Sequence, residues 1–291
     1  MNNISIISHI KNDIEFVPQF WKHIHSYNPK EIIILDTGSI DGTYELLTGL
    51  PKQDGIQYII EKFPYYTGMV PVFNKLVSMA TSEWVIKLDV DELLRKKTIN
   101  EIVYIIEKGI YNCISIPTIH HFINSDLFFN CIRDYPDYHQ RIFKKEVFNI
   151  NSSTYSKNHG CIIWNDNLKV ETLGFDHALY HYSFLRSFEK IQKRSIINYY
   201  IDIEKVEDAE ALKNVELNIK EHIELFKTEN RQVVPAWQVV PILLKFNDLE
   251  EYYISQFTCW GKRNFFAMPE DLILHTIENN WNNAKKKLSI L

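Results

Sequence analysis

Hydrophobic and polar positions follow two different periodicities along the first third of the chain. Short runs rich in isoleucine and valine favour strands, and they occupy residues 4–8, 31–35, 56–61 and 84–88. Between these runs, apolar residues recur at helical spacing, which predicts helices over 16–26, 41–50 and 72–80. Strands that alternate with helices in this way predict an α/β fold, with a parallel sheet covered by helices on both faces.

The second half of the chain has a different pattern. Strands are expected at 114–119 and around Gln140-Arg141-Ile142-Phe143, and from Arg186 onward charged segments with helical spacing dominate. These helical segments cover 187–193, 207–227, 235–244, 249–257 and 270–288. The pattern predicts an α/β domain over 1–185 and a helical region over 186–291. That region carries no chemical motif, and we expect it to pack on the first domain, to shape an acceptor site or to mediate a homodimer.

Composition argues against several classes of function. The 291 residues carry a formal net charge of −5, and no basic stripe typical of a nucleic-acid-binding protein is evident. No run of about 18 apolar residues predicts a transmembrane helix, and the first residues lack the pattern of a signal peptide. The four cysteines are scattered without zinc-site spacing, which predicts reduced thiols. We therefore expect a cytoplasmic protein, with peripheral contact at the inner face of a membrane left open.

The run Trp84–Leu88 ends abruptly in the carboxylates of Asp89, Asp91 and Glu92. Two acids at the end of a buried strand can hold Mg²⁺ or Mn²⁺ against a phosphate, because these cations take oxygen ligands and a diphosphate can supply the rest. An acidic turn or a helix N-terminus would explain the same residues, since the helix dipole favours acids there. The short motif alone leaves both interpretations open.

A second polar segment, residues 36–43, leads from a predicted strand into a predicted helix. Asp36 lies at the end of the strand, where its carboxylate could accept a hydrogen bond from a base N–H or a ribose hydroxyl. A structural turn with Asp41 or Thr43 as the helix cap explains the composition equally well. Ligands of parallel sheets gather beyond the carboxyl ends of the strands, and the polar residues 9–13 also fall there.

Four segments follow one another in a specific order along the chain. They are Lys11-Asn12-Asp13, then ILDTGSIDGT, then FNKLVSMATSEWVIKLDVDE, and finally QRIF. In these motifs the chain resembles family 2 glycosyltransferases of the GT-A fold, and it is most similar to the bacterial branch related to lipopolysaccharide core glucosyltransferases. The resemblance covers roughly residues 4–185. It implies a mixed, mainly parallel sheet flanked by helices, with a helical C-terminal region.

The resemblance also implies an activity. It implies inverting, metal-dependent transfer of a sugar from a nucleotide-diphosphate donor, with a UDP-sugar as the first choice. The acceptor would be a hydroxyl of a glycan, a lipid-linked glycan or a protein, and the pathway would be surface glycan biosynthesis. The cofactor would be Mn²⁺ or Mg²⁺.

Single residues take implied roles from the same motifs. For binding of the donor, the resemblance implies Asn12, Asp36, Asn74 and Asp89. For the metal it implies the DxD motif acids Asp89 and Asp91, with His181. For catalysis it implies Asp91, Glu92, Asp137 and Arg141. Phe73 departs from the pattern, since it stands where the family often has an arginine that would contact a phosphate or base, and Lys75 is left open as a substitute.

Several questions stay open at the level of the sequence. Arg141 is expected either to hold a leaving phosphate or to orient a carboxylate, against the alternative of a surface ion pair. The base that activates the acceptor is undecided between Asp134, Asp137, Glu171 and His159.

Two other functions are also left open. One is a nucleotidyltransferase-like sugar-nucleotide enzyme, and the other is a catalytically degenerate scaffold that binds sugar nucleotides.

Overall fold

A computed structural model describes the chain in several ranges. They are residues 3–63, 69–122, 128–129, 137–148, 167–184, 193–194, 196–197, 199–201, 204, 206 and 208–228. The chain divides into two compact units. The first holds residues 1–117, 139–179 and 205–213, and the second holds 118–138, 180–204 and 214–291. The expected division into 1–185 and 186–291 stays a prediction.

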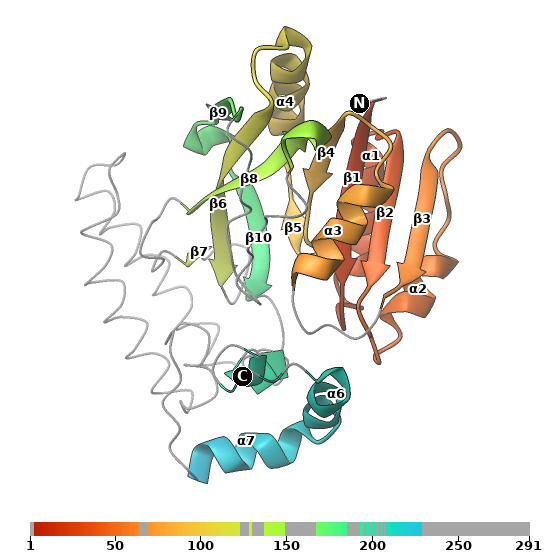
Figure 1. The fold of residues 1–291 in the computed structure, drawn as a ribbon, viewed down its shortest axis with the longest axis vertical. Coiled ribbons are helices and arrows are strands. Elements are labelled where there is room, and N and C mark those ends of the chain that lie inside the picture. Colours follow the sequence, from red (N-terminus) through yellow and green to blue (C-terminus); the bar gives the residue numbers. More distant parts are fainter. Residues whose placement is uncertain are drawn as a thin grey trace, which may run out of the picture. The chain divides into compact units, whose positions relative to one another are not determined.

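The framework of the first unit is a mixed sheet, whose strands are the arrows in Figure 1. Its strand order begins β3-β2-β1-β4-β8-β6. The described strands of the chain are β1 (Ile4–Ile10), β2 (Glu31–Asp36), β3 (Gln57–Lys62), β4 (Trp84–Lys87), β5 (Glu92–Leu93), β6 (Cys113–Phe122), β7 (Phe128–Phe129), β8 (Asp137–Lys144), β9 (Val170–Thr172) and β10 (Leu179–Phe184).

The first four strands in this order run parallel. Ile6 of β1 pairs with Ile32 of β2 on one side and with Ile86 of β4 on the other, and β3 continues in parallel beside β2. β8 then runs antiparallel to β4, with Ile142 opposite Ile86. The parallel strands and the mixed character of the sheet confirm the expected fold class. Because β1, β2 and β4 run in one direction, their carboxyl ends lie at one edge of the sheet.

Helices cover both faces of this sheet, as expected. The described helices are α1 (Val17–Ser26), α2 (Thr43–Gly49), α3 (Met69–Met79), α4 (Lys96–Lys108), α6 (Ala209–Leu217) and α7 (Ile219–Thr228), with short 3₁₀ turns η1 (Lys145–Val147) and η2 (Phe175–His177). Neighbouring side chains of a strand point to opposite faces. Ile6 and Ile32 therefore join a core with α1, α2 and α4, whereas Ile7 and Ile33 join a core with α3. Figure 1 shows α3 in front of the sheet and α1 behind it.

Some local predictions need correction. Gly42, with φ of +89°, is the N-cap of α2, so neither Asp41 nor Thr43 is the cap residue. Asp41 still serves this helix end, since its carboxylate accepts the N–H of Thr43 at 3.0 Å. The helical spacing over 207–227 corresponds to two helices, α6 and α7, which are separated at Asn218. The predicted helices at 235–244, 249–257 and 270–288 lie outside the described residues.

The described part of the second unit is held by a small aromatic and aliphatic cluster. Ile196 and Tyr199 pack with Ile219 and Ile223 of α7. Beside them the hydroxyl of Tyr200 and Nδ1 of His222 are 2.9 Å apart. None of the described helices combines the length and the apolarity that crossing a membrane would require.

Candidate functional site

Three polar segments follow β1, β2 and β4 at the carboxyl edge of the parallel strands. They are residues 9–13, 36–43 and 89–92. The parallel registers bring them together, since Ile10 pairs with Asp36 and Ile7 pairs with Lys87. Polar groups that the sequence separates by tens of residues thus meet where ligands of parallel sheets bind.

The loops after β1 and β2 are joined by hydrogen bonds. The N–H of Asn12 donates to Oγ of Ser39 at 2.9 Å, and Oδ1 of Asn12 accepts the N–H of Ile40 at 2.8 Å. Asn12 has a positive φ of 55°, a conformation that asparagine adopts more readily than most residues. The N–H of Asp13 donates to Oγ1 of Thr43 at 2.9 Å. Asn12 therefore connects the two loops. Its predicted contact with a sugar-nucleotide donor stays a prediction.

Asp36 has one carboxylate oxygen in hydrogen bonds and one without a partner among the described residues. Its side chain is buried, and Oδ1 accepts the N–H groups of Gly38 at 3.0 Å and Ser39 at 2.9 Å. Oδ2 is also buried, yet it has no hydrogen-bond partner among the described residues. A buried acceptor without a donor is costly, by about 1–3 kcal/mol. The geometry thus leaves Oδ2 suited to accept an N–H or O–H from a bound molecule.

Asp89 is surrounded by basic groups. Both of its carboxylate oxygens lie 2.5 Å from Nζ of Lys87. Nδ1 of His9 lies 3.4 Å from Oδ1, and Nη1 of Arg141 lies 3.5 Å from Oδ2. Burial by itself would raise the pKa of Asp89, but the charges of Lys87 and Arg141 outweigh burial and hold this pKa well below its usual range. Asp89 is therefore ionised near neutral pH.

Glu92 and Arg141 hold the turn that carries Asp89. Oε2 of Glu92 accepts the N–H of Asp89 at 2.8 Å, while Oε1 accepts a hydrogen bond from Nη2 of Arg141. The Glu92 side chain is fully buried and that of Arg141 is 11% exposed. Arg141 thus pairs with two carboxylates, and these ion pairs are largely buried instead of lying at the surface. A contact of Arg141 with a leaving phosphate stays a prediction. Contact of Glu92 with a sugar stays a prediction.

His9 and Lys87 belong to this network although the sequence did not single them out. Burial lowers the pKa of His9 to about 4, so the imidazole is neutral near pH 7 despite the neighbouring Asp89. Burial, together with the charge of Arg141, also lowers the pKa of Lys87, while Asp89 opposes this shift. The available signal was a lysine at the end of the apolar run Trp84–Leu88, where a charge needs a partner.

The acids at this edge meet the needs of a divalent cation in part. Asp91 is buried, and its charge raises the pKa of both His9 and Asp89, which places it in the same cluster. Its carboxylate has the hard oxygen atoms that Mg²⁺ and Mn²⁺ prefer. Asp89 already has Lys87 against both oxygens, and the described residues contain no group of three side chains arranged as metal ligands. The residues fit a metal held by Asp91 with further oxygens from a ligand.

Phe73 on α3 stands at the position where the resembled family often has an arginine, and its packing explains why an apolar residue is found there. Phe73 is buried, and its ring stacks near Phe143 and Phe148, at centroid distances of 6.5 and 5.5 Å. Burying an arginine charge at this position would cost free energy unless the charge were paired. Lys75 is exposed and Asn74 is partly buried on the same helix. A role of Asn74 in donor binding stays a prediction.

The remaining candidates do not join this cluster within the described residues of the first unit. Glu171 of β9 pairs with Ile114 near the start of β6. The N–H of Lys144 bonds to the carbonyl of Asn112, and Lys144 pairs with Trp84, so this region is the opposite end of the sheet from Asp89. Asp137 and His181 belong to the second unit, and their roles stay predictions. Asp134 and His159 lie outside the described residues.

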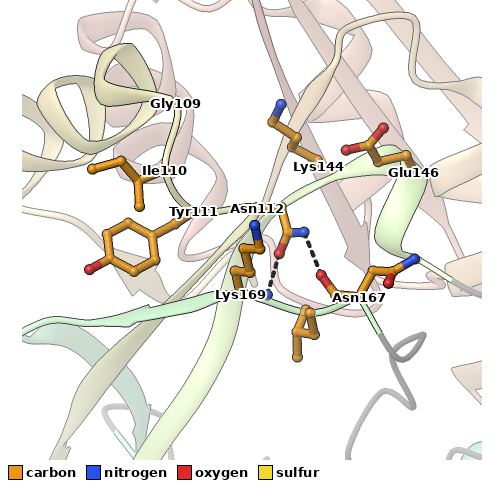
Figure 2. Close-up of a pocket in the computed structure, with 9 residues that line it drawn as sticks. Gly109, Ile110, Tyr111, Asn112, Lys144, Glu146, Asn167 and Lys169 are labelled. Carbon is orange, nitrogen blue, oxygen red and sulfur yellow. Dashed lines mark hydrogen bonds between the residues drawn. The ribbon is translucent and has the colours of Figure 1, made fainter.

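A hollow of about 510 Å³ lies at that opposite end of the sheet, and Figure 2 shows its lining. The side chain of Asn112 crosses it, donating to the carbonyl of Asn167 at 2.8 Å and accepting the N–H of Lys169 at 2.7 Å. Nζ of Lys144 lies 2.5 Å from a carboxylate oxygen of Glu83. These hydrogen bonds and this ion pair join neighbouring segments of the chain. They explain the polar side chains of the hollow without a ligand.

Comparisons with known proteins find one family model and several similar solved structures. A family model described as glycosyl transferase family 2 matches residues 5–165. Among solved structures, S. aureus TarS is 14% identical with a TM-score of 0.48, and the match covers 87% of this chain and 49% of TarS. This chain thus matches about half of the length of TarS. No curated protein matches the chain.

Two complexes also match the chain. Residues 1–349 of S. aureus TarS with UDP-GlcNAc are 13% identical, with a TM-score of 0.48 and coverage of 97% of this chain and 89% of that one. The mannosyltransferase PcManGT from Pyrobaculum calidifontis with GDP-Man and Mn²⁺ is 12% identical, with a TM-score of 0.45 and coverage of 94% and 79%.

Proposed function

The chain belongs to glycosyl transferase family 2, and on that basis we propose that it moves a sugar from a nucleotide-diphosphate donor to an acceptor hydroxyl with inversion at the anomeric carbon. One observation carries this proposal. The buried oxygen of Asp36 that has no partner among the described residues lies at the same edge of the sheet as the charged cluster around Asp89. A base that donates hydrogen bonds and a diphosphate that needs counter-charge would use these two features together.

Asp36 supports a donor whose base presents a ring N–H. Uracil, thymine and guanine have such a group, whereas neutral adenine and cytosine do not. Oδ2 of Asp36 would accept this N–H, while Oδ1 remains on the backbone of Gly38 and Ser39. We propose a UDP-sugar as the first choice among these donors, in keeping with the resemblance of the sequence motifs.

Asp91 would hold the metal of the donor complex, with diphosphate oxygens as further ligands. When bound, Mn²⁺ or Mg²⁺ would supply Lewis-acid stabilisation of the charge on the leaving diphosphate. Arg141 and Glu92 hold the Asp89 turn in place, so the acids do not need to reorganise when the donor arrives. We keep His181 as a proposed further ligand.

A carboxylate or imidazole would remove the proton of the acceptor hydroxyl as this oxygen attacks the anomeric carbon. Asp137 is our proposed base. We propose a surface glycan, a lipid-linked glycan or a protein as the acceptor, in keeping with the resemblance to the lipopolysaccharide core branch. A cytoplasmic location at the inner face of a membrane and a homodimer through the C-terminal region belong to the same proposal.

Donor binding and transfer can be tested in two steps. In thermal unfolding with UDP-, GDP- and dTDP-sugars, with and without Mn²⁺, we expect a UDP-sugar with Mn²⁺ to raise the melting temperature most. Adenosine and cytidine diphosphates are matched controls that lack the ring N–H. Nucleotide release in the presence of candidate acceptors then measures transfer. Stabilisation by no donor would contradict the proposal, and binding without any release would favour the degenerate scaffold.

A further inference from the structure

The hydroxyl of Tyr27 binds the backbone just beyond the acidic turn, by which we mean residues 89–92. It donates to the carbonyl of Leu94 at 2.9 Å and accepts the N–H of the same residue at 3.1 Å. Leu94 follows Glu92 by two positions and is 1% exposed. A single side chain thus binds both backbone polar groups at the point where the chain leaves the turn.

Tyr27 is itself fixed by packing. It is the C-cap of α1, it is 6% exposed, and it belongs to the same hydrophobic core as Leu94. Phe20 and Ile24 of α1 lie in this core as well. Burial raises the pKa of Tyr27 to about 12, so the hydroxyl keeps its proton near neutral pH and can donate it. The chain beyond the acidic turn is therefore anchored to a packed helix.

The acidic turn is also held at its entry and by bonds within itself. At the entry, the N–H of Leu88 donates to the carbonyl of Ile7 on β1 at 3.1 Å. Within the turn, the N–H of Glu92 donates to the carbonyl of Asp89 at 2.9 Å, and Oε2 of Glu92 accepts the N–H of Asp89 at 2.8 Å. Tyr27 supplies the corresponding contact at the exit. Glu92 lies close to this exit, so its position depends on where the tyrosine fixes the chain.

We propose that Tyr27 is a positioning residue for sugar transfer, which fixes Leu94 and thereby keeps Glu92 and the acidic turn in one arrangement. This inference rests on the proposed function. Without the hydroxyl, two buried backbone groups lose a hydrogen-bond partner, which is costly, so the exit of the turn shifts or opens. The proposed base contact of Asp36 belongs to another loop and stays intact. We therefore expect transfer to suffer more than donor binding.

Tyr58→Phe is a matched control for Tyr27→Phe. The hydroxyl of Tyr58 also has two polar partners, since it accepts the N–H of Gln53 at 2.9 Å and lies 2.5 Å from Nε2 of His25. His25 belongs to α1 as well, yet Tyr58 is on β3, which β2 and β1 separate from β4 in the sheet. Each variant thus removes one hydroxyl with two hydrogen bonds, but only Tyr27→Phe does so next to the acidic turn.

Amide hydrogen exchange followed by NMR, without any ligand, tests the link directly. The N–H groups of Asp89 and Glu92 are informative, because each is hydrogen-bonded within the turn and not to Tyr27. We expect Tyr27→Phe to speed their exchange about tenfold, because the turn opens more often, and Tyr58→Phe to change it less than about threefold. Unchanged exchange in Tyr27→Phe would overturn the proposal. Equal acceleration in both variants would also overturn it, since a general loss of stability would then explain the result.

The wild type alone provides a second test, which serves if Tyr27→Phe does not fold. When exchange is measured at increasing urea concentrations below unfolding, amides that open together show the same urea dependence. We expect the N–H groups of Leu94, Asp89 and Glu92 to open together. Continued protection of Leu94 while the other two exchange independently would overturn the proposal.

Kinetic measurements connect this link to sugar transfer. We expect Tyr27→Phe to lower kcat about tenfold while KM for the donor stays within about threefold, and Tyr58→Phe to resemble the wild type. Combining Tyr27→Phe with Glu92→Gln should cost less than the sum of the two effects, because both loosen the same turn. Full kcat in Tyr27→Phe, or strictly additive effects, would overturn the positioning role. No transfer by the wild type, with the faster exchange in Tyr27→Phe still present, would instead count against the proposed transferase.

Discussion

The two ends of strand β2 each carry a buried carboxylate, but their surroundings differ. At the start of the strand, Glu31 is fully buried and accepts hydrogen bonds from Ser5, from the N–H of Thr81 at 2.6 Å and from the N–H of Ser82 at 3.1 Å. At the end of the strand, Asp36 has one oxygen on two backbone N–H groups and one without a described partner.

The same contrast holds for the two edges of the sheet. At the starting edge, where the parallel strands begin, both Nδ2 and Oδ1 of Asn112 form hydrogen bonds, and Lys144 forms an ion pair with Glu83. At the finishing edge, where the parallel strands end, Asp36 has one oxygen without a partner among the described residues, and Asp91 adds negative charge next to Asp89. Polar groups that the fold satisfies act in stability, whereas a buried group without a described partner needs another explanation, for which we propose a ligand. We therefore expect substitutions at the two edges to affect different properties.

The largest expected effect is at the finishing edge. Asp91→Asn should lower kcat/KM for transfer by about 1,000-fold or more, because an amide oxygen holds a divalent cation much more weakly than a carboxylate. Its melting temperature should stay within a few degrees of the wild type without ligand. Asp176→Asn, at an exposed acid of η2, is the matched control. Transfer within tenfold of the wild type would contradict a role of Asp91 at the metal.

The next effect is on stability at the starting edge. Glu31→Ala should lower the free energy of unfolding by about 3 kcal/mol, because it leaves the buried donors of Ser5 and Ser82, and the N–H of Thr81, without their acceptor. Urea unfolding followed by tryptophan fluorescence measures this loss. Glu61→Ala, at an exposed position of β3, is the control and should change little. A loss as small as that of the control would mean that the network does not stabilise the fold.

Patterns of the sequence were sufficient to predict the first four strands and the edge at which the site lies. Isoleucine-rich runs have few alternatives to buried strands, and parallel strands must end at one edge, so the positions of Asp36 and Asp89 followed. The cap of α2 was missed because Gly42 reaches a positive φ that Asp41 and Thr43 seldom adopt.

Contacts between distant segments were not predictable in the same way. The pairing of Arg141 with Glu92 depends on the register of β4 against β8, which no local pattern encodes. The packing of Phe73 depends likewise on Phe143 of another strand. Residue types indicated the chemistry of the edge, whereas the tertiary structure determined which charges neutralise one another.

A smaller effect is expected from Asp36→Asn. Asparagine keeps an oxygen for Gly38 and Ser39 but places an NH₂ where Oδ2 would accept the base N–H. Donor affinity should fall by about tenfold, which corresponds to one hydrogen bond of about 1.4 kcal/mol. Isothermal titration with the donor and Mn²⁺ measures this change, and Asp54→Asn at an exposed loop position is the control. Equal affinity of Asp36→Asn and the wild type would exclude a contact between Oδ2 and the base.

The smallest effect is the pH dependence that Glu31 gives to stability. Burial opposes ionisation of Glu31, but the hydrogen bonds from Ser5, Thr81 and Ser82 outweigh burial and lower its pKa in the folded protein. A carboxyl whose pKa is lower in the folded protein stabilises the fold above its unfolded pKa, about 4.3, and loses this stabilisation as the pH falls through the folded pKa.

Glu31→Gln tests this dependence, because the glutamine side chain does not titrate. The stability difference between the wild type and Glu31→Gln should therefore be constant from pH 7 to about pH 5 and should shrink below about pH 4. Urea unfolding of both proteins at each pH measures this difference. A difference that stays constant at the lowest pH values where both proteins remain folded would mean that the network does not depend on the charge of Glu31.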